Sequence, residues 1–185
     1  MSALVSLWLP ILLSAVVVFV ISSLVHMVFK WHAADYGRFE NEEAIRVAIR
    51  GAHPAPGRYV IPFCGGMKDM ASEAMKQKYA EGPVGHVTML PNGQPNMGKY
   101  LGMWFLLSVL VSAVAAFLAV KAYGLGAPAL GAAKMAGAVA FVGYGFGTLQ
   151  ESVWMGRPWS ATIKYLIDAA LYAVGTAAVF YFLWR

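Results

Sequence analysis

The chain has 185 residues, of which 59% are apolar and 12% are charged, and its formal net charge is +5. Soluble domains carry about twice this share of charged residues, so the composition excludes an ordinary soluble domain and indicates an integral membrane protein. The basic surplus does not predict nucleic-acid binding, because the lysines and arginines flank apolar runs, where lipid headgroups attract them.

Four apolar runs are long enough to cross a bilayer, which takes about 20 helical residues. The first predicts a transmembrane helix within residues 1–29, which we expect to remain in the mature protein because it lacks a basic leader and a cleavage site. The other three predict helices at about 100–120, 129–150 and 161–184, within a three-helix segment 100–185. The expected class is an all-α integral membrane protein with four transmembrane helices.

Residues 30–99 form a polar module between the first and second runs. Asn41 and Ser72 are suited to cap short helices, and residues 58–63 and 85–90 resemble short strands. We therefore expect a small α/β insertion between the first two transmembrane helices. Elements this short bury too little surface to be stable alone, so contacts with the bundle or with a partner should stabilise the module.

The orientation follows from the distribution of basic residues. Residues 30–99 hold nine lysines and arginines, and the segment before the first run holds none. The positive-inside rule then predicts a cytoplasmic module with both termini outside, in a bacterial inner membrane. A single cysteine forms no internal disulfide, which agrees with a reducing compartment.

The last two apolar runs carry ionisable residues, which are costly within a bilayer and mark functional or paired positions. Asp168 follows Lys164 by one helical turn, and Glu151 ends the third run, just before a loop that contains Arg157. Two antiparallel helices would bring Glu151 near Arg157 and Lys164, with Asp168 slightly deeper. The simpler interpretation is an ion-paired cluster that fixes the hairpin, and the alternative is a proton or ion site built on Asp168 and Glu151.

Small residues recur at four-residue intervals on three of the runs, a pattern that lets helices approach closely. They are Ser108, Ser112 and Ala116; Gly143 and Gly147; and Ala169, Ala173 and Ala177. We expect these faces to pack within the bundle or, alternatively, against another membrane chain.

Within the module, Cys64, His53 and His86 are the side chains with metal-ligand chemistry. Their spacing matches no zinc pattern, so the sequence predicts no metal, no cofactor and no catalytic residue, and the three remain secondary candidates. His26 is the only histidine in a predicted span, and we expect it to be an ordinary interfacial residue, because a haem would require a second ligand at membrane depth.

The leading functional hypothesis is a non-enzymatic accessory or structural subunit of a larger membrane complex. Its partners would be the lipid bilayer and other membrane chains or further copies of itself. The first alternative is a small homo-oligomeric transporter or channel with Asp168 and Glu151 along its path. The second is a metal-binding or catalytic membrane protein that uses Cys64, His53 and His86.

Overall fold

The computed structural model describes residues 3–184, so residues 1, 2 and 185, at the ends of the predicted segments 1–29 and 100–185, lie outside the described part. Within it, the predicted class is confirmed: four helices are long and apolar enough to cross a membrane, and a two-stranded sheet lies between the first and second. The chain divides into two compact units, which are described separately. The first contains the residues up to Tyr36, Asn96–Ser152 and those from Arg157 onward, and the second contains Gly37–Pro95 with Val153–Gly156.

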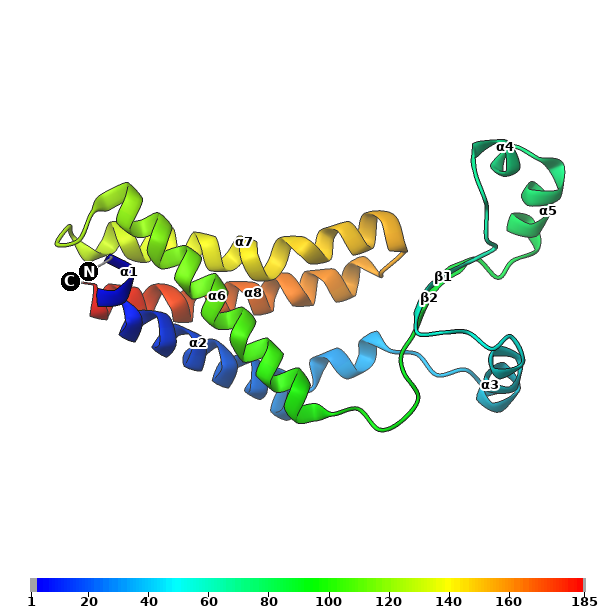
Figure 1. Cartoon of the computed structure of the whole chain (residues 1–185), viewed down its shortest axis with the longest axis horizontal. Helices are drawn as coiled ribbons and strands as arrows, with labels where there is room; N and C mark the ends of the chain where they lie inside the picture. Colours follow the sequence, from blue (N-terminus) through cyan, green and yellow to red (C-terminus); the bar gives the residue numbers. More distant parts are fainter. Residues whose placement is uncertain (1–2, 185) are drawn as a thin grey trace. The chain divides into compact units, whose positions relative to one another are not determined.

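The first unit is a helical bundle (Figure 1). Its elements are α1 (Ala3–Ser6), α2 (Trp8–Ser23), the π-helix η1 (Leu24–Phe29), the 3-10 helix η2 (Trp31–Asp35), α6 (Met97–Tyr123), α7 (Ala129–Met155) and α8 (Trp159–Leu183). α6 begins ahead of its apolar run because the Asn96 side chain caps it, accepting a hydrogen bond from the Lys99 backbone N–H at 3.0 Å.

Small residues set the contact between α7 and α8. Gly137 lies against Ala173 and Ala177, and a Cβ added to this glycine would lie 3.1 Å from the Ala177 Cβ. Gly145 lies equally close to Ala169, again with 3.1 Å between an added Cβ and its neighbour. Because there is no space for a side chain at either glycine, the two helices approach closely along this line.

The glycines of the predicted Gly143–Gly147 pair point elsewhere. Gly143 faces Val111 of α6, whereas a Cβ on Gly147 would meet no atom within 4 Å. Successive residues on an α-helix differ by about 100°, so Gly145, midway between them, is the one directed at α8. The predicted small face of α6 is buried inside the bundle: Ser108, Ser112 and Ala116.

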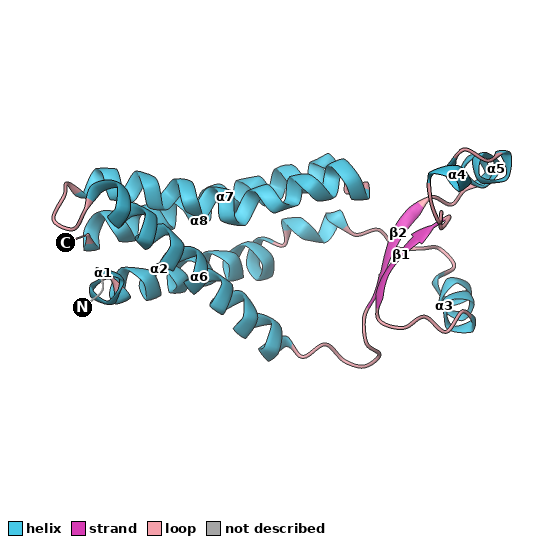
Figure 2. Cartoon of the chain, turned by 45° about the horizontal axis from the view of Figure 1, so that its top comes forward, coloured by secondary structure: helices cyan, strands magenta, loops and turns pink. Residues whose placement is uncertain are grey.

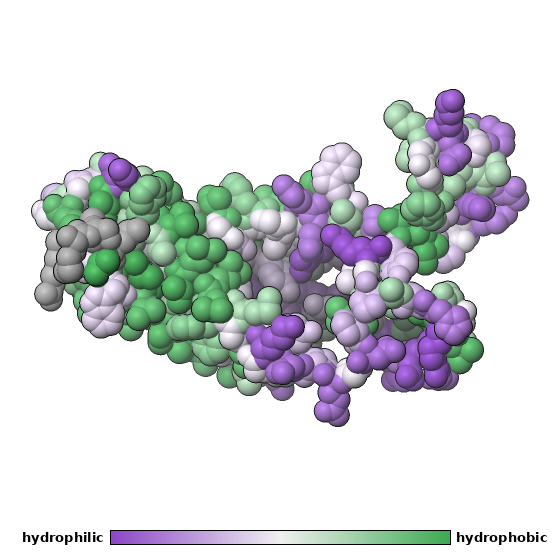
Figure 3. All heavy atoms as spheres, in the orientation of Figure 1, coloured by the Kyte–Doolittle hydropathy of each residue, from purple (hydrophilic) through white to green (hydrophobic). Residues whose placement is uncertain are grey.

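The apolar core of the bundle lies at the end where α2 begins and α8 ends. It includes Leu7, Ile11, Ala115, Ala119, Phe180 and Trp184. Figure 3 shows a mostly apolar outer surface over this end of the bundle, which gives way to polar side chains toward the end that carries η2 and the α7–α8 loop. In a bilayer, the apolar surface faces lipid.

The second unit is a two-stranded antiparallel sheet with short helices at its ends (Figure 2). Its elements are α3 (Glu42–Gly51), β1 (Gly57–Ile61), α4 (Met67–Met70), α5 (Glu73–Glu81) and β2 (Gly85–Met89). Both predicted caps are confirmed: the side chains of Asn41 and Ser72 accept hydrogen bonds from the N–H groups of Ala44 and Met75. Within residues 37–95, all of which are described, Met75 is the only buried side chain, so the unit has almost no core of its own.

Candidate functional site

The four ionisable residues singled out on the last two spans and the loop between them belong to two separate groups. Glu151 near the end of α7 pairs with Arg157 of the α7–α8 loop, and the Glu151 side chain is 53% exposed. Lys164 and Asp168 form their ion pairs with residues of η2 instead. The structure therefore brings together Glu151 with Arg157, while Asp168 lies in a different and more deeply buried setting.

His32 of η2 lies between two carboxylates. Its Nδ1 is 2.8 Å from Oδ2 of Asp35, and its Nε2 is 2.7 Å from Oδ2 of Asp168. The three side chains are only 7%, 8% and 2% exposed, respectively. Each contact requires a hydrogen between nitrogen and oxygen, so the ring fastens α8 to the end of the first span through both of its nitrogens.

Lys164 balances the charge of this group. Its Nζ donates to the backbone oxygen of Trp31 at 2.9 Å and to Oδ1 of Asp35. The hydrogen bond from Lys164 is the main reason that the pKa of the Asp35 carboxyl lies below its ordinary value, and the bond from His32 acts in the same direction while burial opposes them. Asp35 is therefore ionised at neutral pH, with Lys164 as its counter-charge.

His26 stacks on His32, with 4.8 Å between the ring centres and 13° between the planes. Its Nδ1 lies 2.9 Å from the Ser22 carbonyl oxygen, and since a carbonyl can only accept, this nitrogen carries the hydrogen. The Tyr165 ring lies 4.4 Å from the ring of His32. We refer to His26, His32, Asp35, Lys164 and Asp168 together as the His32 cluster.

A local departure from α-helical geometry positions both histidines. In η1 the N–H of Lys30 donates to the carbonyl oxygen of Val25, five residues back, at 3.1 Å. Such π-helical turns accommodate one extra residue and are frequent at functional sites. Lys30 then adopts a left-handed conformation with φ of 52°, and the chain turns into η2, which packs against α8.

One oxygen of Asp168 is unused. Oδ1 is buried and has no hydrogen-bond partner among the described residues, although Oδ2 is bonded to His32. The Nε1 of Trp31, in the turn that carries His32, is likewise buried and has no hydrogen-bond partner within residues 3–184. A buried carboxylate oxygen without a partner is energetically costly, so this position favours an additional cation or donor.

An aromatic layer separates the His32 cluster from the apolar core. Tyr172, one turn after Asp168, packs against Tyr144 and Trp104, with ring centres 5.3 and 6.0 Å away. The indole N–H of Trp104 donates to the Ser22 hydroxyl at 2.9 Å. Ser22 thus contributes its backbone oxygen to His26 and its hydroxyl to this layer, which links the two.

Within residues 3–184, one group of three metal-ligating side chains is gathered closely enough to share an ion. It consists of His26, His32 and Asp168, whose ligand atoms all lie within 4.8 Å of one another. The sequence-based candidates Cys64, His53 and His86 belong to the second unit, and the described residues form no such group there.

A pocket of about 250 Å³ opens beside Asp35. It is lined by Asp35, Tyr36, Glu151, Arg157, Pro158 and Ala161. The Arg157 guanidinium also lies 4.2 Å from the centre of the Tyr165 ring, which in turn covers His32. The pocket therefore joins the Glu151–Arg157 pair to the edge of the His32 cluster.

Sequence reasoning singled out Asp168 and Lys164 but missed their partners. His32 precedes Asp168 by 136 residues and Asp35 precedes Lys164 by 129, so no linear spacing indicates either contact. A local signal was nevertheless present, because a histidine and an aspartate three residues apart directly follow the first span. Such a pair on one helical face can bond to itself and to a neighbouring helix.

Comparison of the chain with protein-family models, with curated proteins and with solved structures gives no match. The geometry of the His32 cluster therefore carries the functional argument.

Proposed function

We propose that this integral membrane protein binds a cation at the His32 cluster and passes it on, as a small transporter does. The observation that carries the proposal is the buried Asp168 carboxylate, bonded through one oxygen and unpartnered at the other among the described residues. Ionisable groups inside membrane-spanning segments are costly and usually line ion or substrate paths.

A purely structural ion pair explains this cluster less well. Asp35 is satisfied by Lys164 and His32, so both of its oxygens have donors. Asp168 shares the same histidine and bonds to it through Oδ2 alone, so its Oδ1 has no hydrogen-bond partner within the described residues. The cluster thus lacks one donor or cation at Oδ1 of Asp168, and a bound cation would supply it.

Asp168→Asn tests the proposal, because it removes the charge and preserves the shape of the side chain. The purified protein would be reconstituted in liposomes on a solid-supported membrane, and currents recorded after concentration jumps of protons, Na⁺, K⁺ and divalent cations. We expect Asp168→Asn to reduce the wild-type current at least tenfold.

Glu73→Gln is the matched control, since it removes an exposed, ion-paired carboxylate of the second unit. Its current should stay within about twofold of wild type, because an exposed ion pair contributes little. Size-exclusion profiles and melting temperatures would show that both variants are folded. A wild-type protein that carries no current with any of these cations, or an Asp168→Asn variant as active as wild type, would sink the proposal.

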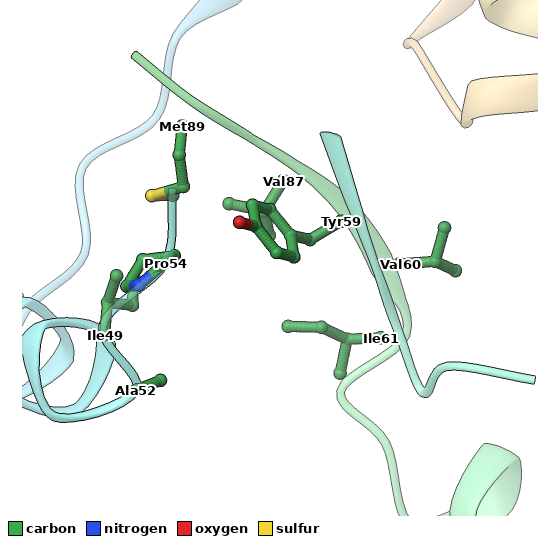
Figure 4. Close-up of a pocket in the computed structure, with 8 residues that line it drawn as sticks. All are labelled: Ile49, Ala52, Pro54, Tyr59, Val60, Ile61, Val87 and Met89. Carbon is green, nitrogen blue, oxygen red and sulfur yellow. The ribbon is translucent and has the colours of Figure 1, made fainter. Parts of the chain in front are cut away.

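A second candidate function, docking as an accessory subunit onto another membrane chain, is favoured by the apolar face of the insertion. The pocket in Figure 4, of about 250 Å³, lies between α3 and one face of the sheet. It is lined by Ile49, Ala52, Pro54, Tyr59, Val60, Ile61, Val87 and Met89. Tyr59 and Ile61, which share this face, are 38% and 43% exposed, and apolar strand residues left open in this way are typical of interaction surfaces.

A photo-crosslinking amino acid at position 61 tests this second candidate in the native membrane. Docking predicts one discrete adduct, formed with a membrane protein that also co-purifies stoichiometrically with this chain. The same probe at the exposed Lys76 should give no adduct. Equal labelling from both positions would count against a specific docking face.

A further inference from the structure

We infer that the ion held by the His32 cluster is a divalent first-row transition-metal ion, bound by Nε2 of His26, Nε2 of His32 and the carboxylate of Asp168. The inference rests on the proposed function, because it names the class of cation that the same site takes. The three side chains come from η1, η2 and α8, and their ligand atoms already lie within 4.8 Å of one another.

Both imidazoles are oriented as metal-binding histidines are. Metal-ligating histidines almost always donate their second ring N–H to a carboxylate or to a backbone carbonyl, which fixes the ring and leaves the other nitrogen for the metal. Nδ1 of His26 is held by the Ser22 carbonyl at 2.9 Å, and Nδ1 of His32 by the Asp35 carboxylate at 2.8 Å. Nε2 is therefore the free nitrogen of His26 and the nitrogen that His32 directs at Asp168.

Asp35 is suited to this supporting role. Its Oδ1 accepts from Lys164 and its Oδ2 contacts His32, so it remains an ionised acceptor for the His32 Nδ1–H. An ionised carboxylate behind a ligating imidazole makes the ring a more basic ligand. Lys164 thereby fixes the outer carboxylate without competing for Asp168.

Asp168 provides an independent observation. Its side chain is 2% exposed, and its Oδ1 is buried without a hydrogen-bond partner among the described residues. The His32 Nε2 contact at 2.7 Å requires a proton between nitrogen and oxygen, and a metal ion bound by the same two atoms takes the place of that proton. The ion would also lie beside the carboxylate whose Oδ1 has no other partner among the described residues.

The donor set selects the class of metal. Two imidazole nitrogens with one carboxylate suit Zn²⁺, Fe²⁺, Mn²⁺, Co²⁺ and Ni²⁺, whereas Mg²⁺ and Ca²⁺ prefer oxygen ligands alone and Cu⁺ prefers sulfur. Three protein ligands leave at least one coordination position open, which distinguishes an exchangeable site from a closed structural one. An exchangeable site is what delivery of the ion onward requires.

Binding requires only a small closure. Metal bonds of about 2.0–2.1 Å in tetrahedral geometry separate ligand atoms by about 3.3 Å, so separations of up to 4.8 Å must shrink by at most roughly 1.5 Å. His26 is the exposed member of the set, and the Ser22 carbonyl that holds its Nδ1 lies one turn earlier on the same span, so the ring can tilt inward while that bond is kept. His32 and Asp168 are already in contact and need hardly move.

Co²⁺ is the probe, because its visible absorption reports coordination directly. The full-length protein, purified in detergent with a tag that contains no histidine, would be titrated with Co²⁺ and then with competing Zn²⁺. We expect one equivalent of Co²⁺ to produce the intense visible bands of a four-coordinate nitrogen–oxygen site, and Zn²⁺ to abolish them. His26→Gln should weaken Co²⁺ binding at least tenfold and reduce the band intensity.

His86→Gln is the matched control, because it removes a histidine of the second unit and should leave the titration unchanged. Asp35→Asn adds a measurement that does not depend on removing a ligand, and loss of such an outer partner should weaken binding by about 10- to 100-fold. The inference is overturned if wild type shows no Co²⁺ bands, or if His26→Gln and wild type bind Co²⁺ alike.

The two proposals fail separately. Suppose that the protein carries an Asp168-dependent current of protons, Na⁺ or K⁺ but shows no Co²⁺ bands. The transport proposal then stands and the metal assignment is overturned. Suppose instead that the Co²⁺ bands require His26 and Asp168 but the protein carries no current. The metal site then stands and the transport proposal is overturned.

Discussion

Lys164 lies only one helical turn from Asp168, yet it bonds to the Asp35 carboxylate, and His32 bonds to Asp168. Its ammonium bonds to Asp35 and to the Trp31 backbone oxygen, so it secures the turn that holds His32. A buried charge that loses its partner is far more costly than an exposed one, because water cannot replace the missing interaction.

Lys164→Met should therefore lower the melting temperature in detergent by more than about 5 °C, since it leaves the buried Asp35 charge with His32 alone. Lys76→Met, which breaks the exposed pair with Glu73, should shift it by no more than about 3 °C. Adding Asp35→Asn to Lys164→Met should recover part of the loss. Equal shifts for the two lysine variants would mean that the Lys164 pair contributes no more than a surface contact.

Among the elements, the packing of α7 against α8 depends on those glycines of α7 whose positions around the helix direct them at α8. Gly137 and Gly145 lie against alanines of α8, while Gly147 on the same helix faces open space. Position along the helix therefore matters more than the presence of a repeated glycine motif.

Gly137→Leu should destabilise the bundle by about 2 kcal/mol or more, because its side chain must displace Ala173 and Ala177. Gly147→Leu should be neutral or stabilising by up to about 1 kcal/mol, since it gains helix propensity without a clash. Unfolding in an SDS titration followed by circular dichroism measures both. A Gly137→Leu variant as stable as Gly147→Leu would contradict the close α7–α8 contact.

Some features of these elements could be predicted from the sequence, and others could not. The four spans and the caps at Asn41 and Ser72 were predictable, because bilayer thickness and unsatisfied helix N–H groups impose local requirements. Asp168 was recognisable for the same reason, as a charge in an apolar run. Its contact with His32 was not, because it depends on how the first span meets the last. The π-helical turn that makes this contact leaves no recognisable pattern in the residues Leu24–Phe29.

For the whole chain, the distribution of basic residues predicts that residues 30–99 face the cytoplasm and the α6–α7 loop faces the opposite side. Cys64, the only cysteine of the chain, reports the first of these positions without any substitution. Its thiol is partly exposed and not disulfide-bonded.

A membrane-impermeant maleimide should therefore label Cys64 only after the membrane of intact cells is permeabilised. With Cys64 replaced by serine and Leu125→Cys introduced in the α6–α7 loop, where Leu125 is 45% exposed, labelling should occur without permeabilisation. The reverse pattern would invert the orientation, and labelling of both cysteines from outside would contradict a chain with four spans.

The π-helical turn at Leu24–Phe29 makes the His32 cluster sensitive to chain length at one place. A one-codon deletion there, for example of the exposed Val28, would restore ordinary α-helical bonding and rotate everything that follows by about 100°. Every ligand would still be encoded, yet His32 would no longer be directed at Asp168. The number of residues in this turn sets the direction in which His32 points. That number, as much as the identity of the side chains, must therefore be inherited for the site to persist.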